Sequence, residues 1–304
     1  MTARVDAWPP LPQESWQPTY ETLHMWTQIV GKIRRTLTPL INHWWNVPLY
    51  VTARGLTTSP IPYGERTFEI QFDFIDHKLR IETCEGLTKQ LDLRPRSVAD
   101  FYQELTQSLH SLAIDAKIHA TPDEVANPIP FAEDTTHKYY DPESAHTFWR
   151  ILVTVDSIFK EFRGRFIGKC SPVHFYWGSF DLAVTRFSGR RAPERPGADA
   201  VTREAYSHEV ISAGFWPGGV DIKGPAFYAY AAPEPPGYKT ARVQPEAAFY
   251  HGGMSEFFLM YDDVRRAESP EAMLLDFLES TYVAAADLAK WDRASRERTT
   301  EPRP

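Results

Sequence analysis

Two hydrophobic patterns follow one another along this chain and predict an α+β fold, with antiparallel sheets flanked by long helices. In long stretches apolar residues recur every three or four positions, and in shorter ones every second position. The order helix, strands, helix occurs once in each half of the 304 residues. We therefore also expect a diverged internal duplication of a helix–strands–helix unit.

In the first half, Tyr20 to Leu37 has the apolar spacing of a helix, which Pro39 ends. A strand is expected over 48–56. Residues 68–83 then alternate between apolar and polar side chains around a turn at 76–78, which is typical of a hairpin with one wet face. Ser97 is the expected N-cap of a second helix, because an acidic residue follows three positions later and an apolar stripe continues the pattern.

In the second half, Asp141 followed by proline predicts the start of a third helix. An aromatic strand follows from Val173, and then an Arg- and Pro-rich loop over 188–203. A short helix is expected over 204–213, because Gly214 stands where a helix C-terminus favours glycine. The remaining elements are expected to be strands over 226–232 and 256–261 and a last helix that begins at Ser269-Pro270.

At this length the elements could form one large domain or two halves of ordinary domain size. The segment between the halves is polar and contains three prolines, as in a connection that runs over a surface. The expected parts are an N-terminal arm (1–19), a globular unit (20–291) made of two similar halves (20–114 and 141–291), a connection (115–140) and a disordered tail (292–304).

Composition excludes several classes of protein. The formal net charge is −7 and no stripe of lysine and arginine is visible, which disfavours nucleic acid as a partner. No apolar run is long enough to span a membrane, and the N-terminus lacks the pattern of a signal peptide. The two cysteines lie far apart in the sequence, as free thiols of a reducing compartment do, so we expect a cytoplasmic protein. The oligomeric state stays open.

The segment from Ser171 to Arg191 carries the strongest functional signal. It is an aromatic ribbon interrupted by His174, Asp181 and Arg186, which are costly to bury without partners. This combination predicts a wall of a pocket. Further candidates to line it are aromatic side chains just before the first expected strand of each half, and others on or just after the expected helix at 204–213. The candidates for contact with a substrate are Trp44, Trp45, Trp177, Trp216 and Tyr206.

Histidine and carboxylate residues are the candidates for proton transfer, because a histidine next to a carboxylate exchanges protons near neutral pH. These candidates are His174, His208, Glu209 and Asp181. The alternative is that they make structural hydrogen bonds and ion pairs. His208-Glu209 begins like a zinc-protease signature, but Ser212 occupies the position of the second histidine. A different metal site built from His174, His208 and Glu209 stays a minor alternative, and no cofactor is predicted.

Arginine residues follow the aromatic strand and could hold a carboxylate or phosphate of a substrate with paired hydrogen bonds. Arg186, which is expected within the strand, and Arg190, in the loop after it, are the candidates. The alternative is that these arginines pair with nearby acidic residues of the chain.

Three segments resemble a bacterial family of unknown function, DUF5996. They are the runs 42–52, 175–190 and 206–210, which read NHWWNVPLYVT, FYWGSFDLAVTRFSGR and YSHEV. The resemblance extends from about Trp16 to Trp291 and implies a single full-length unit. It implies no activity, cofactor or catalytic residue.

The sequence leaves three functional hypotheses. The leading one is an enzyme that uses histidine and carboxylate groups on a small anionic, partly apolar or aromatic molecule in an aromatic-lined pocket. The second is a non-catalytic module that binds a ligand or a protein through the same aromatic and arginine surface. The third is a metal-dependent enzyme.

Overall fold

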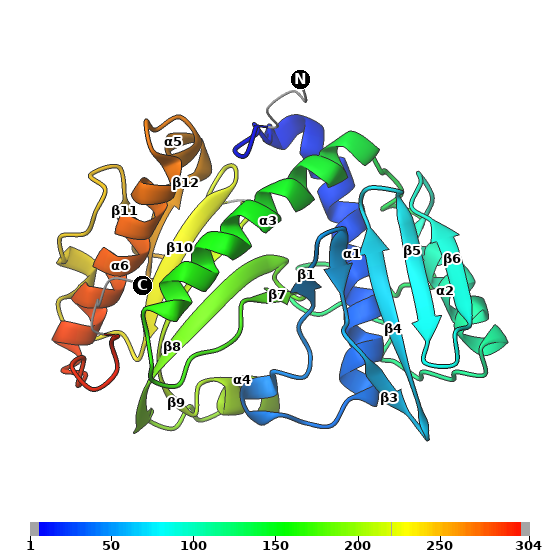
Figure 1. Cartoon of the computed structure of the whole chain (residues 1–304), viewed down its shortest axis with the longest axis horizontal. Helices are drawn as coiled ribbons and strands as arrows, with labels where there is room; N and C mark the ends of the chain where they lie inside the picture. Colours follow the sequence, from blue (N-terminus) through cyan, green and yellow to red (C-terminus); the bar gives the residue numbers. More distant parts are fainter. Residues whose placement is uncertain (1–5, 220, 299–304) are drawn as a thin grey trace, which may run out of the picture.

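A computed structural model describes residues 6–219 and 221–298 of the chain (Figure 1). Over these residues the fold is α+β with antiparallel sheets, as predicted. It has two six-stranded sheets and six α-helices. The two sheets lie side by side, one built from each half of the chain.

The first sheet is a meander in the order β1-β2-β4-β5-β6, with β3 paired to β4. Its strands are β1 (Tyr50–Val51), β2 (Gly55–Thr57), β3 (Ile61–Tyr63), β4 (Arg66–Asp73), β5 (Lys78–Thr83) and β6 (Thr88–Asp92). The predicted hairpin is β4 and β5, with Ile70 opposite Ile81. The single strand expected over 48–56 is instead β1 and β2, which pair antiparallel with each other.

Two helices accompany this sheet, α1 (Gln13–Leu37) and α2 (Val98–Ser111). They pack together through stacked rings of Trp26 and Phe101, with centroids 4.7 Å apart. The Ser97 hydroxyl accepts a hydrogen bond from the Asp100 backbone N–H, so the predicted N-cap of α2 is confirmed. Helix α1 begins earlier than predicted, and this extra segment buries Trp16.

The second sheet has the order β11-β12-β10-β9-β8-β7. Its strands are β7 (His174–Tyr176), β8 (Asp181–Arg191), β9 (His208–Trp216), β10 (Ala226–Ala232), β11 (Phe249–His251) and β12 (Glu256–Met260). The aromatic ribbon of the sequence is thus two antiparallel strands, because a turn at 177–180 reverses the chain.

The predicted helix over 204–213 is wrong. A shorter helix, α4 (Ala200–Ala205), precedes this region, and most of the predicted helix is strand β9. The run from Val210 to Phe215 is almost wholly apolar, and such a run suits a buried strand as well as a helix. Strand pairing decides here, because Ser212 lies between Thr185 on β8 and Tyr230 on β10.

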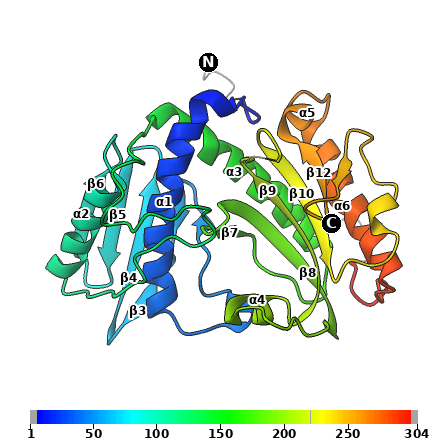
Figure 2. The ribbon, with the colours of Figure 1, turned by 180° about the vertical axis from the view of Figure 1, so that it is seen from behind.

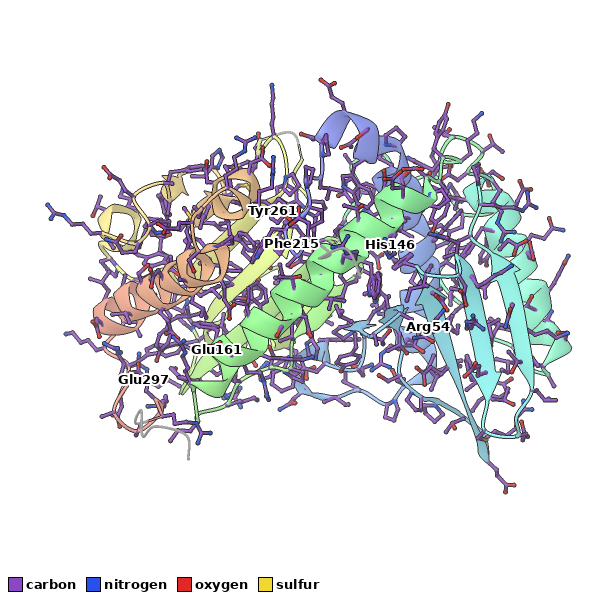
Figure 3. The ribbon with its side chains drawn as sticks, turned by 45° about the horizontal axis from the view of Figure 1, so that its top comes forward. Arg54, His146, Glu161, Phe215, Tyr261 and Glu297 are labelled. Carbon is purple, nitrogen blue, oxygen red and sulfur yellow. The ribbon has the colours of Figure 1, made fainter. Side chains whose placement is uncertain are left out.

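Helices α3 (Pro142–Gly164) and α6 (Pro270–Leu288) cover one face of the second sheet. Phe215 and Tyr261 lie together in this layer, with ring centroids 5.7 Å apart (Figure 3). The Asp141 carboxylate accepts the Ser144 backbone N–H, so this predicted N-cap is also confirmed. A short helix, α5 (Tyr261–Arg265), and two 3₁₀ turns, η1 (Asn42–Trp44) and η2 (Tyr238–Thr240), complete the elements.

The two sheets meet at Leu49 and Phe175. Each residue donates its backbone N–H to the carbonyl of the other, both at 2.9 Å. Helix α1 lies along this junction and α3 contacts both β1 and β8 (Figures 1 and 2). The two halves are therefore physically continuous, whereas the internal duplication stays a prediction.

The C-terminal segment differs from the predicted disordered tail over residues 292–298. There the backbone N–H of Ile167 donates to Arg296 at 2.7 Å, and that of Arg298 donates to Arg165 at 2.9 Å. Residues 299–304 and the first five residues of the predicted arm lie outside the described residues. Among the helices that the structure describes, none has the length and apolar character to cross a bilayer.

Candidate functional site

A cavity of about 910 Å³ lies on the face of the second sheet that α3 and α6 leave uncovered. This size falls within the range of small-molecule sites. In Figure 2 this face of the sheet is turned toward the viewer, with α1 beside it and α4 at its lower edge. Helix α1, turn η1, helix α4 and the loop at 123–124 contribute the remaining walls.

The alternation of side chains along the strands selects the residues of the cavity floor. On β8 the floor residues are Asp181, Ala183, Thr185 and Phe187, and the residues between them face the helices. Strands β9, β10 and β12 follow the same rule. They contribute Val210, Ser212, Trp216, Tyr228, Tyr230, Glu256 and Phe258.

Asp181 is a buried carboxyl group at the start of β8. It accepts hydrogen bonds from the Ser179 hydroxyl at 2.5 Å and from the Tyr228 hydroxyl. Burial raises its pKa above the ordinary value, although these two donors act in the opposite direction. The Tyr228 pKa is raised well above its ordinary value by the same burial and by the Asp181 charge.

Gly214 makes the contact between Tyr228 and Asp181 possible. It lies directly opposite Tyr228 in the strand pairing, and a Cβ atom at this position would be 2.3 Å from the tyrosine ring. The ring therefore lies over the glycine. A side chain at position 214 would displace the phenol from the floor.

Glu256 and Glu124 are two further carboxyl groups of the cavity. Burial, with the charge of Asp181 as a second cause, raises the pKa of Glu256 to about 7. Burial and the charges of Asp181 and Asp123 also raise the pKa of Glu124. The Glu124 carboxylate lies against Gly178, where an added Cβ would be only 2.6 Å from its Oε1. Three carboxyl groups therefore share one poorly solvated space.

Helix α1 supplies Tyr20, His24 and Arg35 to the wall. The His24 ring lies 2.7 Å from the carbonyl oxygen of Gly178, to which its Nε2–H donates when neutral. Burial lowers the His24 pKa to about 4, so the imidazole is neutral at physiological pH. Arg35 lies over the Trp44 ring at 5.3 Å and pairs with Asp123 at 3.3 Å.

Turn η1 and helix α4 hold each other over one end of the cavity. The His43 Nδ1–H donates to the backbone carbonyl of Glu204 at 3.0 Å. The His43 backbone N–H donates to the Glu204 side-chain carboxylate at 3.2 Å. Nε2 of His43 is then free to accept from Lys169 at 2.6 Å. Burial and the Lys169 charge lower the His43 pKa. His43 and Trp44 both have positive φ, which marks a strained turn.

The structure places five sequence-predicted aromatic residues around this one cavity. They are Trp44, Trp45, Trp177, Trp216 and Tyr206. Trp177 is fixed by a hydrogen bond from its Nε1 to the Val47 carbonyl at 2.9 Å. Tyr206, just after α4, is linked through its hydroxyl to that of Tyr230 at 2.9 Å. Asp181 is the one sequence-predicted proton-transfer candidate that lines the same cavity.

His174 lies beside the cavity but outside its lining. The reversal of the chain after β7 brings it to the same face as Asp181, but Tyr176 stands between them. The His174 ring contacts the hydroxyls of Tyr176 at 3.2 Å and Tyr50 at 3.4 Å. Burial lowers its pKa to about 3, so His174 is a neutral member of a buried hydrogen-bonded chain.

His208 and Glu209 do not act together, because neighbouring residues of a strand point to opposite faces. His208 lies 3.1 Å from the Ser207 hydroxyl, near His43. Glu209 instead forms an ion pair with Arg190 at 2.7 Å. The interpretation of these residues as neighbours on a helix is wrong, since β9 replaces that helix.

The two arginine candidates also lie away from the cavity. Arg186 is buried on the helix-covered face, where its guanidinium lies over the Phe162 ring at 3.4 Å and near Glu279 at 3.4 Å. Arg190 donates to the Ala289 carbonyl at the end of α6. Within residues 6–219 and 221–298, no three His, Cys, Asp or Glu side chains gather as metal ligands. His174, His208 and Glu209 therefore form no ligand set.

Sequence reasoning missed Glu124, Glu256 and Tyr228. Tyr228 and Tyr230 alternate with alanine along β10, and this polar alternation was the available signal. Glu256 begins a strand that is otherwise apolar. Glu124 lies in the connection between the halves, where no periodic pattern indicates which side chains turn inward.

Comparison with known families gives one match. The model of the family of unknown function DUF5996 matches residues 8–298. Neither the curated proteins nor the solved structures yielded a match. Because the family match spans nearly all of the chain, this protein belongs to the DUF5996 family.

Proposed function

We propose that the protein is an enzyme that binds a small, partly aromatic or apolar molecule in this cavity and transfers protons with carboxyl groups. One observation carries the proposal. Asp181, Glu256 and Glu124 line a single aromatic cavity, and burial raises the pKa of each. Carboxyl groups with raised pKa values in a pocket are typical of acid–base sites.

Glu256 is the proposed proton donor and acceptor. Its pKa of about 7 means that both protonation states are populated at neutral pH, which favours general acid–base catalysis. Asp181 is held by two hydroxyl donors and is the proposed anchor for the reacting molecule. The aromatic side chains of the walls would bind its apolar part.

This proposal changes the chemistry that the sequence suggested. His174 is enclosed behind Tyr176, and Arg186 and Arg190 are engaged on the other face. We therefore transfer the acid–base role to the carboxyl groups and keep Asp181. The cytoplasm stays the proposed location, since Cys84 and Cys170 are both free thiols.

A non-catalytic ligand-binding protein is the second candidate. It is favoured by the absence of a hydrogen bond to the Glu256 or Glu124 carboxylate among the described residues, which leaves both available for recognition alone. A concave site with walls from a helix, a turn and a sheet favours a small molecule over a partner chain.

The test begins with thermal-shift screening of a metabolite library, followed by mass-spectrometric detection of turnover of each hit. With a substrate in hand, Glu256→Gln should lower kcat at least about 100-fold, since it removes the exchangeable proton. Glu268→Gln, an exposed carboxyl outside the cavity, is the matched control. Wild-type turnover in folded Glu256→Gln and Asp181→Asn proteins would contradict the enzyme proposal.

A further inference from the structure

The charges of the cavity lining are strongly unbalanced. Five carboxyl residues line the cavity, Asp123, Glu124, Asp181, Asp199 and Glu256, whereas Arg35 is the single lysine or arginine in the lining that the structure describes. The lining histidines His24 and His43 have lowered pKa values and add no charge at neutral pH.

Two of these carboxylates are already engaged within the protein. Asp123 pairs with Lys32 at 2.8 Å and with Arg35. Asp199 caps α4 by accepting the backbone N–H groups of Val201 and Thr202. The remaining three, Asp181, Glu124 and Glu256, have no cationic partner among the described residues. An anion bound at this end of the cavity would lie beside these three groups.

The aromatic walls complement such a charge. Tyr228 and Tyr230 stack at 6.1 Å on the floor, and the Asp181 and Glu256 charges both act on Tyr228. Faces of tyrosine and tryptophan attract cations through their quadrupoles. The carboxyl groups and the aromatic faces therefore favour the same kind of ligand group.

The cavity floor is long enough to hold the body of a ligand as well as one charged group. Asp181 and Phe187 are the first and last floor residues of β8, a span of about 20 Å at strand spacing. Phe187 lies beside Trp45, with ring centroids 5.8 Å apart. One end of the cavity is thus acidic. The other end is aromatic, and the Lys169 ammonium lies over its Trp45 and Phe187 rings at 5.3 and 5.2 Å.

We propose that the ligand is an organic cation, an amine or related nitrogen base with an aromatic or apolar body, whose nitrogen binds at the acidic end of the cavity, which Asp181, Glu256 and Glu124 line. The inference rests on the proposed function only in taking the cavity as a ligand site. The body of the ligand lies toward Trp45 and Phe187. Binding of the cation holds Glu256 in its ionised form, so a proton leaves the protein when the ligand binds near neutral pH.

The test uses three probes that share an indole ring with a two-carbon linker and differ in the terminal group: tryptamine, the neutral alcohol tryptophol and the anion indole-3-propionate. Calorimetric titration of the full chain at pH 8 should show that tryptamine binds at least about tenfold more tightly than tryptophol, with the anion weakest. Glu256→Gln and Asp181→Asn should each remove most of this preference for the amine. Trp45→Ala should weaken tryptamine and tryptophol alike.

Each result has a defined meaning. Circular dichroism checks that the variants fold, and Glu268→Gln serves as the control that keeps wild-type affinity. If the anion binds as tightly as the amine and Trp45→Ala weakens it, the cationic inference is overturned while the ligand site stands. If no probe binds at millimolar concentration, the inference is overturned, and library hits that are insensitive to Trp45→Ala would overturn the proposed site as well.

Discussion

The two faces of the second sheet treat buried charge in opposite ways. On the helix-covered face, Arg186 is surrounded by three aromatic rings and has Glu279 as its ion-pair partner. On the cavity face, Asp181 has hydroxyl donors but no cationic partner among the residues that the structure describes. Both residues belong to β8, so one strand contains a compensated charge and an uncompensated one. The difference teaches that the aromatic ribbon of the sequence combines a structural side with a functional side.

The largest expected effect is on the compensated face. Arg186→Ala should lower the free energy of unfolding by about 3–4 kcal/mol, because it empties the space between three rings and leaves Glu279 without its partner. Chemical denaturation measures the loss. Arg191→Ala, at the exposed end of the same strand, is the control and should change stability by less than about 0.5 kcal/mol. Equal losses in both variants would contradict a structural role specific to Arg186.

The next largest effect concerns the contact between Tyr228 and Asp181. Gly214→Ala should destabilise the protein by about 1–3 kcal/mol, because its Cβ would overlap the Tyr228 ring. Gly252→Ala, where an added Cβ meets no atom within 4 Å, is a matched control. A ligand of the cavity should bind more weakly to the Gly214→Ala protein even where that protein is fully folded. If the affinity for the ligand is unchanged, the contact between Tyr228 and Asp181 does not contribute to ligand binding.

On the cavity face, removing a carboxyl group should raise the free energy of unfolding, whereas removing Arg186 on the other face lowers it. Glu256 has a folded pKa of about 7 against an ordinary value of 4.5, so the folded state binds more protons between these pH values. Stability is therefore lost as pH rises through this window. Glu256→Gln removes that penalty and should raise the free energy of unfolding at pH 8 by roughly 1–3 kcal/mol, with no gain near pH 4.5. A gain that does not depend on pH would argue against a raised pKa.

The smallest effect concerns the segment just after α4, which forms part of the cavity wall. Tyr206→Phe removes the hydrogen bond to Tyr230 and should cost about 1 kcal/mol. Because this bond ties the segment after α4 to the floor, trypsin should cut faster at the neighbouring Arg203, whereas Arg195 precedes a proline and is not a trypsin site. Tyr139→Phe, an exposed tyrosine elsewhere, should leave the cleavage rate unchanged. Equal cleavage rates in the wild-type protein and both variants would show that this hydrogen bond does not hold the segment after α4 in place.

Much of the secondary structure could be predicted because it depends on local chemistry. Ser97 and Asp141 are N-caps, and residues 68–83 form the expected hairpin, since caps and alternation act over a few residues. Prediction failed at 204–213, where a run of apolar residues has no period that separates helix from strand. There the neighbouring strands β8 and β10 decided the conformation.

The site divides in the same way. Trp44, Trp177 and Trp216 could be selected because polar groups and glycines interrupt aromatic stretches, and the structure places all three on one cavity. Their functional partners could not be selected. Glu124 and Glu256 come from a connecting loop and the end of a hairpin, and only their burial near Asp181 raises their pKa values.

By itself the sequence determined the α+β class, the long helices, most of the strands and the aromatic residues that surround the cavity, because these depend on patterns within short segments. Only the tertiary structure decided that Arg186 and Asp181 lie on opposite faces of the sheet. It also decided that Glu124 and Glu256, rather than His174 and His208, share the cavity with Asp181. The physical reason is that burial and the pKa of a group depend on neighbours that are distant in the chain.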